Sequence, residues 1–380
     1  MPSSAQALVP VMVAALAGAG LVMVSGLASG DVVALPLQAV AGVLALLSAV
    51  CLLKVWVMGG VALNLLRKAQ MLTMGIAHLV LSRDKGWSKS KLPDPAGVAA
   101  EGKTVTLYFI RHGESEWNSI FNVGIPAGLN VHKLKIIPRL LLALLRELVL
   151  SVTPDSIFFD SPLNADGIEQ AVRLADTLAG STDKAAAPLR STSAKNSVVV
   201  VSNLRRAIET VFLCLRPRLA GSGERVVMHS SLQEISRNID TLALAQPGGT
   251  PAMPALAAAL DGTLDAEACL ECYANSGNKP LLGNGLARMQ AFCEWSFGRQ
   301  ERTIIVGGHS LWFRSFFQTF LPKECTEELA KTAKTNKVQN CGVVCFKLSR
   351  GAVDGKTWYR IEQDSIRAVQ GGFEEDKKKK

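Results

Sequence analysis

The N-terminal 53 residues constrain the fold most, because they contain one charged side chain, Asp31, and no lysine or arginine. Two uncharged runs, residues 7–29 and 32–53, flank Gly30-Asp31. Each run is as long as the roughly 20 residues that a helix needs to cross a bilayer core. The pattern predicts a transmembrane helical hairpin in residues 1–60. A cleaved signal peptide fits poorly because no positive charge precedes the first run, and a buried soluble helix pair is the other alternative.

The positive charge of the chain begins directly after these runs. The net charge is +9, and seven basic residues follow within 40 positions: Lys54, Arg67, Lys68, Arg83, Lys85, Lys89 and Lys91. A positive flank favours the cytosolic side of a membrane, so residues beyond 54 are expected in the cytosol. Residues 61–103 are interpreted as a basic juxtamembrane segment and linker. Within them, 62–81 fits either a helix on the membrane surface or an ordinary packing helix.

The charged C-terminal tail, residues 366–380, ends in four lysines. Lys377 and Lys378 resemble the di-lysine retrieval signal of endoplasmic reticulum membrane proteins, and a solvated charged tail is the alternative. The basic residues flank the apolar runs and the tail instead of forming a patch interleaved with aromatic residues. We therefore expect a membrane partner and no nucleic acid.

The eight cysteines predict neither a disulfide framework nor a metal centre. Cys269 and Cys272 form a C-x-x-C pair, but no second pair or histidine lies at zinc-like spacing. We expect reduced thiols, no metal and no cofactor.

The pattern changes to an alternation of strands and helices in residues 104–365, the predicted catalytic domain. Short apolar runs at 104–110, 197–201, 225–228, 303–307 and 343–348 are typical of buried strands. Helical stretches at 164–178, 204–219, 285–297 and 311–320 separate them. This predicts an α/β layered domain with a largely parallel sheet. Residues 138–152 form an amphipathic insertion that we expect to pack on the domain, with membrane or partner contact as alternatives. Residues 241–264 are expected to form a loop or cap.

Polar residues follow four of the predicted strands, where the carboxyl ends of parallel strands form a common ligand-binding edge. Arg111 and His112 follow the first strand, and His309 and Ser310 follow 303–307. Arg205 and Arg206 follow 197–201 at the start of a helix, and Glu234 follows 225–228. Each of these residues by itself is more often structural or solvent-exposed than part of a functional site. Together, two histidines, arginines and a carboxylate form the set that phosphoryl transfer uses.

Four ordered blocks carry a resemblance to a known family. They are R-H-G-E-S-E-W-N at 111–118, D-S-P-L at 160–163 with Asp166-Gly167 and Gln170-Ala171, S-N-L-R-R-A-I-E-T at 202–210, and V-G-G-H-S at 306–310. These blocks resemble the histidine phosphatase superfamily, also called the phosphoglycerate mutase-like family, over about residues 104–348. The resemblance implies a three-layer α/β/α domain.

The resemblance also implies roles for individual residues. His112 matches the nucleophile that becomes phosphorylated, and Glu234 matches the proton donor. Arg111, Arg206, His309 and Asn118 match the residues that surround the phosphate, and Ser310 replaces the usual glycine but retains a backbone N–H. The implied activity is hydrolysis of a phosphomonoester without metal or cofactor. The alternatives are an inactive fold that serves as a phosphate-binding or scaffold module, and a mutase. The mutase is disfavoured because residues 121–130 lack a Gly-Trp-x-Asp segment. Substrate class and oligomeric state stay open.

Overall fold

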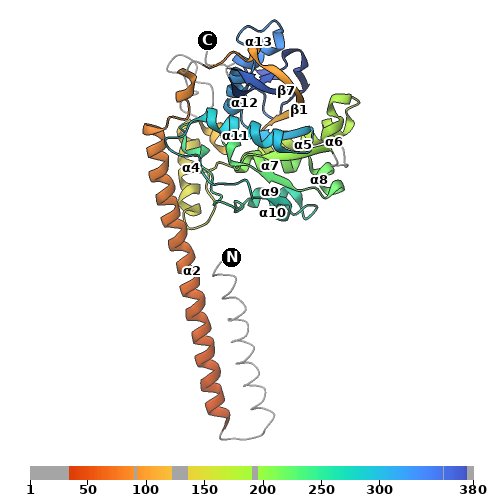
Figure 1. Ribbon diagram of the computed structural model, residues 1–380. Coiled ribbons are helices and arrows are strands. Elements are labelled where there is room, and N and C mark those ends of the chain that lie inside the picture. The colour runs from red at the N-terminus through yellow and green to blue at the C-terminus, as the bar shows by residue number, and fades with distance from the viewer. Residues whose placement is uncertain (1–33, 90–91, 122–135, 191–195, 354, 375–380) are drawn as a thin grey trace. The chain divides into compact units, whose positions relative to one another are not determined.

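The computed structural model describes the chain except for residues 1–33, 90–91, 122–135, 191–195, 354 and 375–380 (Figure 1). The chain divides into two compact units. The first is Met1–Ala69 with Ser151–Thr153, and the second, larger unit is Gln70–Leu150 with Pro154–Lys380. The domain bounds 61–103 and 104–365 stay predictions from the sequence, and the larger unit of the structure begins at Gln70.

Helix α2 (Ala34–Leu81) contains most of the second uncharged run, and the first run lies outside the described residues. Within the described part of the chain, no helix has both the length and the apolar character needed to cross a membrane. The transmembrane hairpin stays a prediction from the sequence.

The last turns of α2, from Gln70 on, pack within the larger unit. Met71 and His78 are buried, and Met71 shares a small apolar cluster with Phe159, Leu242 and Leu244. A Cβ atom added to Gly75 would lie 2.7 Å from Cγ2 of Ile239, so glycine allows this close approach. For this part of 62–81 the structure shows a packing helix.

The central sheet of the larger unit has the strand order β4-β3-β2-β5-β1-β7-β8, and β9 also pairs with β7. Its strands are β1 (Ala99–Arg111), β2 (Ser197–Val201), β3 (Val226–Met228), β4 (Leu270–Glu271), β5 (Thr303–Gly308), β7 (Val343–Val353), β8 (Lys356–Ile361) and β9 (Arg367–Gln370). Neighbours from β4 to β1 run parallel, whereas β7 pairs antiparallel with β1, β8 and β9. The prediction of a mixed α/β domain with a mostly parallel sheet is confirmed.

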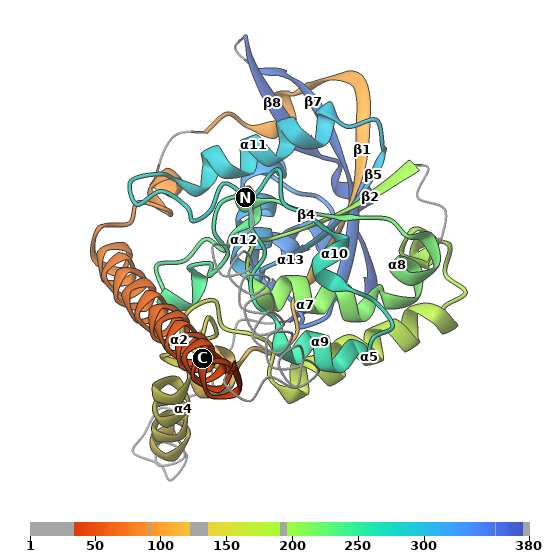
Figure 2. The ribbon, with the colours of Figure 1, turned by 90° about the horizontal axis from the view of Figure 1, so that it is seen from below.

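Helices cover both faces of this sheet. Alternate residues of its buried strands point to opposite faces and pack there into two separate cores. Leu107 and Phe109 of β1 belong to one core with helices α11 (Gly285–Gly298), α12 (Ser310–Phe320) and α13 (Glu328–Thr335). Tyr108 and Ile110 belong to the other core with α5 (Ala165–Gly180), α7 (Arg205–Cys214), α8 (Arg216–Ser222) and α9 (Pro254–Leu260). Figure 2 shows α5, α7 and α9 lying together on one side. The sheet is thus the middle of three layers.

Several elements were not foreseen or differ from expectation. Helix α9 and the short helix Ala266–Cys269 (α10) lie in and after the expected loop 241–264, and β6 (Lys337–Val338) pairs with β10 (Phe373–Glu374) near the C-terminus. Short helices are also found at α3 (Glu116–Phe121) and α6 (Ala187–Arg190).

Helix α4 (Ile136–Leu150) corresponds to the amphipathic insertion, but it does not bury its apolar side as expected. Ala143 is buried and Leu140 and Leu150 are partly buried, whereas Leu148 and Val149 are 70% and 72% exposed. Large apolar side chains on this helix therefore contribute little to the core. The expectation that its apolar side packs on the domain is wrong for most of the helix.

Candidate active site

The register of the sheet places the two predicted site histidines next to each other. Strand β1 ends at Arg111 and its parallel neighbour β5 ends at Gly308, and these two residues are paired in the register. The backbone N–H of His112 donates to the carbonyl of Gly308 at 3.0 Å. The imidazole rings of His112 and His309 consequently lie with their centroids 5.2 Å apart.

A cavity of about 290 Å³ opens beside these strand ends. Six of the seven predicted site residues line it: Arg111, His112, Asn118, Arg206, Glu234 and Ser310. His309, the seventh, is fully buried next to His112. Further basic side chains on the wall are Lys85, Arg314 and Lys337, and Asp240 adds a second acidic one. Cations outnumber carboxylates on this wall, which suits an anionic ligand.

His112 is held as a neutral ring with one defined tautomer. Its Nδ1 lies 2.6 Å from the carbonyl oxygen of Gly113. A carbonyl only accepts hydrogen bonds, so Nδ1 carries the proton and Nε2 keeps its lone pair. Burial, followed by the positive charges of Arg206 and Arg111, holds the pKa of His112 well below its ordinary value. The ring can therefore act as a nucleophile through Nε2.

The Arg-His-Gly turn is held in place by backbone contacts that leave no room for larger residues. The N–H of Gly113 donates to Oγ1 of Thr210 at 3.0 Å. A Cβ atom on Gly113 would lie 2.6 Å from the carbonyl oxygen of Gly167, so the two glycines allow two backbone segments to touch. Gly167 belongs to the second sequence block, whose role is thus to support the turn.

His309 is also buried as a neutral ring. Its Nε2 lies 2.9 Å from Oγ of Ser202, and its Nδ1 has no hydrogen-bond partner within the described structure. Burial, then the positive charge of Arg206, keeps the pKa of His309 well below its ordinary value. An unpaired buried nitrogen costs about 1–3 kcal/mol, and a bound ligand that pairs with it would remove that cost.

Two adjacent arginines at the start of α7 have different surroundings. Arg206 lines the cavity, and its Nη1 donates to the carbonyl of Asp240 at 2.9 Å while Nη2 lies 3.3 Å from that residue's Oδ2. Arg205 is not among the residues that line the cavity, and it instead binds Asp160 and pairs with Asp155. Its Nε donates to the carbonyl of Asp160 at 2.8 Å. Of the two, Arg206 is the one placed to meet a ligand in the cavity.

Asp240 was missed by the sequence reasoning. It is buried, it orients Arg206, and its Oδ1 has no hydrogen-bond partner within the described structure. Burial raises the pKa of Asp240 to about 6, against the opposing effect of Arg206. No motif marks this residue, because it follows Glu234 in an irregular segment and meets Arg206 only through the fold.

Arg111 pairs with the C-terminal segment that was expected to be a tail. Its Nη1 donates to the carbonyl of Val338 at 2.6 Å and to Oε1 of Glu374 at 2.7 Å. Glu374 is brought there by the pairing of β10 with β6. An anionic ligand that binds Arg111 would therefore compete with the Glu374 carboxylate, whose side chain is 43% exposed.

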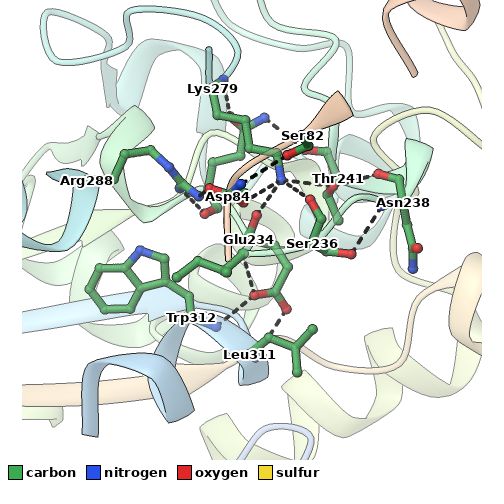
Figure 3. A network of polar contacts seen from close by, with 12 residues as sticks. Ser82, Asp84, Glu234, Ser236, Asn238, Thr241, Lys279, Arg288, Leu311 and Trp312 are labelled. Carbon is green, nitrogen blue, oxygen red and sulfur yellow. Dashed lines mark hydrogen bonds and ion pairs between the residues drawn. The ribbon is translucent and has the colours of Figure 1, made fainter. Parts of the chain in front are cut away.

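The carboxylate of Glu234 lies at the N-terminus of α12 (Figure 3). Oε1 accepts from the backbone N–H of Trp312 at 2.8 Å and of Ile235 at 2.9 Å, and Oε2 from Leu311 at 3.3 Å. These bonds place the carboxylate beside Ser310 at the cavity wall. Within the described residues, no group of His, Cys, Asp and Glu side chains is arranged to hold a metal ion.

No protein-family model matches the sequence, and the comparison with curated proteins gives no match. Among solved structures, a mycobacterial glucosyl-3-phosphoglycerate phosphatase is 15% identical, with 69% of this chain and 98% of that chain covered and a TM-score of 0.33. The ecdysone phosphate phosphatase of Bombix mori is 14% identical (64% and 88% covered, TM-score 0.32). Phosphoglycerate mutase from Thermus thermophilus is 19% identical (66% and 99% covered, TM-score 0.26).

These structural neighbours are histidine phosphatase-like and phosphoglycerate mutase-like proteins. Their identities and TM-scores are low.

Proposed function

We propose that this chain is a phosphatase that hydrolyses a phosphomonoester through a phosphohistidine intermediate on His112. The observation that carries the proposal is the neutral His112, with Nε2 unprotonated, in a cavity that Arg111 and Arg206 also line. Such guanidinium groups balance the charge that develops on the phosphoryl oxygens.

The proposed reaction has two steps. Nε2 of His112 forms a bond to phosphorus while the ester P–O bond breaks. The leaving oxygen takes the proton of Glu234, which starts this step as a carboxylic acid and ends it as a carboxylate. Water then attacks phosphorus and the N–P bond breaks, with Glu234 taking the proton from the water. Orthophosphate is released and His112 returns to its neutral state. Arg111, Arg206 and His309 are proposed to hold the phosphoryl group, and Asn118 and Ser310 to complete its surroundings.

We expect the full-length protein to release inorganic phosphate from at least one class of phosphomonoester in a panel of sugar phosphates, nucleotides, phosphopeptides and lipid phosphates. Full activity is expected in EDTA, because the proposed chemistry uses side-chain cations. Strict dependence on magnesium or zinc would contradict this pocket. Binding of phosphate without turnover of any class would favour the inactive scaffold, and phosphate transfer between two positions of one substrate would favour the mutase.

We also propose that residues 7–53 attach the chain to the membrane of the endoplasmic reticulum. The larger unit is then on the cytosolic side of that membrane. The support is in the sequence: two uncharged runs, the basic residues after them, and the terminal lysines. The full-length protein is expected to stay in the pellet after carbonate extraction of microsomes, and its larger unit to be digested by added protease without detergent. A protected larger unit would overturn this topology.

A further inference from the structure

A lysine is buried behind the wall of the candidate active site. The side chain of Lys279 is 1% exposed, and its Nζ donates to the carbonyl oxygens of Glu234 at 2.7 Å and Ser236 at 2.5 Å. Oγ1 of Thr241 lies 3.3 Å from the same nitrogen. A buried ammonium costs several kcal/mol unless it is paired and fully hydrogen-bonded. The backbone beside Glu234 supplies a large part of that pairing (Figure 3).

The counter-ion of Lys279 comes from a distant part of the chain. Asp84, which follows α2 closely, lies 3.2 Å from Lys279 Nζ through Oδ2 and 2.7 Å from Arg288 Nη2 through Oδ1. Its side chain is 4% exposed. The backbone carbonyl of Asp84 also accepts from the N–H of Gly285 at 2.9 Å, at the start of α11. We refer to Asp84, Lys279 and Arg288 as the Asp84 cluster.

The two cations of this cluster hold the backbone on both sides of Glu234. Arg288 donates to the carbonyl of Gln233, and Lys279 donates to the carbonyls of Glu234 and Ser236. The Glu234 carboxylate meanwhile points to the N–H groups of Leu311 and Trp312. The Asp84 cluster thus fixes the backbone on both sides of Glu234, and this backbone positions the Glu234 side chain at the cavity.

The same lysine also contacts the segment that carries the partner of Arg206. Thr241, whose hydroxyl faces Lys279 Nζ, directly follows Asp240 in the sequence, and Asp240 pairs with Arg206. At this end the ammonium makes only the 3.3 Å contact with Thr241, whose hydroxyl also donates to the carbonyl of Asn238 at 2.6 Å. A loss of the ammonium would therefore release mainly the Glu234 end of the segment 234–241. Such supporting residues commonly change activity by 10–100-fold although they touch no substrate, as is known for outer-shell groups of metal sites.

We propose that Lys279 is a positioning residue for the phosphatase reaction, which holds Glu234 where it protonates the leaving oxygen. This inference rests on the proposed function. A consequence is that the site depends on Asp84, from the segment that connects α2 to β1.

The test compares two substrates in the full-length protein. The alkoxide of an alkyl phosphate is a poor leaving group and needs the proton from Glu234. The p-nitrophenolate of p-nitrophenyl phosphate, an aryl phosphate, is a good leaving group and departs without that proton. Lys279→Met removes the ammonium and keeps the Asp84–Arg288 pair. We expect kcat/KM for the alkyl ester to fall about 10–100-fold and kcat/KM for the aryl ester to change less than about threefold.

Lys103→Met is the matched control, because Nζ of Lys103 also donates to a backbone carbonyl, that of Phe297, at 2.8 Å. It is expected to leave both values unchanged. If Lys279→Met does not fold, Asp84→Asn serves instead, since it keeps the lysine but removes its counter-ion. The same selective loss is then expected, on the order of threefold to tenfold.

Equal losses on both substrates would show a role in folding only, and no loss on either would show that Lys279 does not position Glu234; both results overturn the inference. If the wild-type protein hydrolyses neither ester nor any other phosphomonoester, the proposed function fails instead, so the two failures are distinguishable.

Discussion

His112→Ala is expected to abolish the covalent phosphoenzyme and to lower kcat by several orders of magnitude. In the proposed mechanism the neutral ring supplies the atom that bonds to phosphorus, and alanine leaves no nucleophile at that place. Brief incubation of the wild-type protein with a labelled phosphomonoester should give a protein-bound label that is lost in acid and stable in base. The variant should carry no label.

His229→Asn is the matched control for this substitution. His229 follows β3, is not among the residues that line the cavity, and accepts a hydrogen bond from the N–H of Ser231 through Nδ1. Asparagine retains an acceptor, so label and turnover are expected to stay close to those of the wild-type protein. A labelled and active His112→Ala protein would rule out the mechanism.

Arg206→Lys is expected to lower kcat/KM about 10²–10³-fold, the range found when one preorganised donor to a developing charge is removed. Lysine keeps the charge but loses the planar fork that pairs with Asp240 and that, in the proposed mechanism, also binds the phosphate oxygens. Steady-state kinetics on a substrate from the panel measure the effect. An activity within about threefold of the wild type would show that Arg206 does not hold the phosphoryl group.

Arg205→Lys provides the contrasting change at the next residue. Arg205 binds the Asp160 segment with its guanidinium and its backbone N–H, the latter at 2.8 Å from Asp160 Oδ1. The substitution leaves buried acceptors unpaired, so the free energy of unfolding in urea is expected to fall by about 1–3 kcal/mol. The folded variant should keep its kcat/KM within about threefold. If both arginine variants lose activity equally, the distinction drawn from their contacts is wrong.

The strands of the sheet that are buried on both sides were predictable from local pattern. β2 was predicted at its observed bounds, and β5 to within one residue, because continuous runs of valine and isoleucine suit a strand covered on two faces. β8 and β9 were missed. They lie at or near the antiparallel side of the sheet and carry exposed and charged residues such as Lys356 and Arg367, so no apolar run marks them.

The candidate site likewise has residues that the sequence predicted and residues that it missed. His112 and His309 follow predicted strands, and their proximity follows from the parallel pairing of β1 with β5. The resemblance to the histidine phosphatase superfamily also favoured Arg206 over Arg205, because Arg206 directly precedes Ala207. Asp240 and Lys279 had no such marker, since neither follows a strand end nor repeats with a period.

The sequence by itself determined the strands buried on both sides, the order of the motifs along the chain, and the charge of the site. These properties depend on residues within a few positions of one another, where periodicity and side-chain type suffice. Only the tertiary structure decided which charges meet. Asp84 and Lys279 are 195 positions apart, and Arg111 and Glu374 are 263 apart. Pairs at such separations are brought together by the packing of the sheet and its helices. A charge that is buried there is destabilising unless the fold also brings a counter-ion to it.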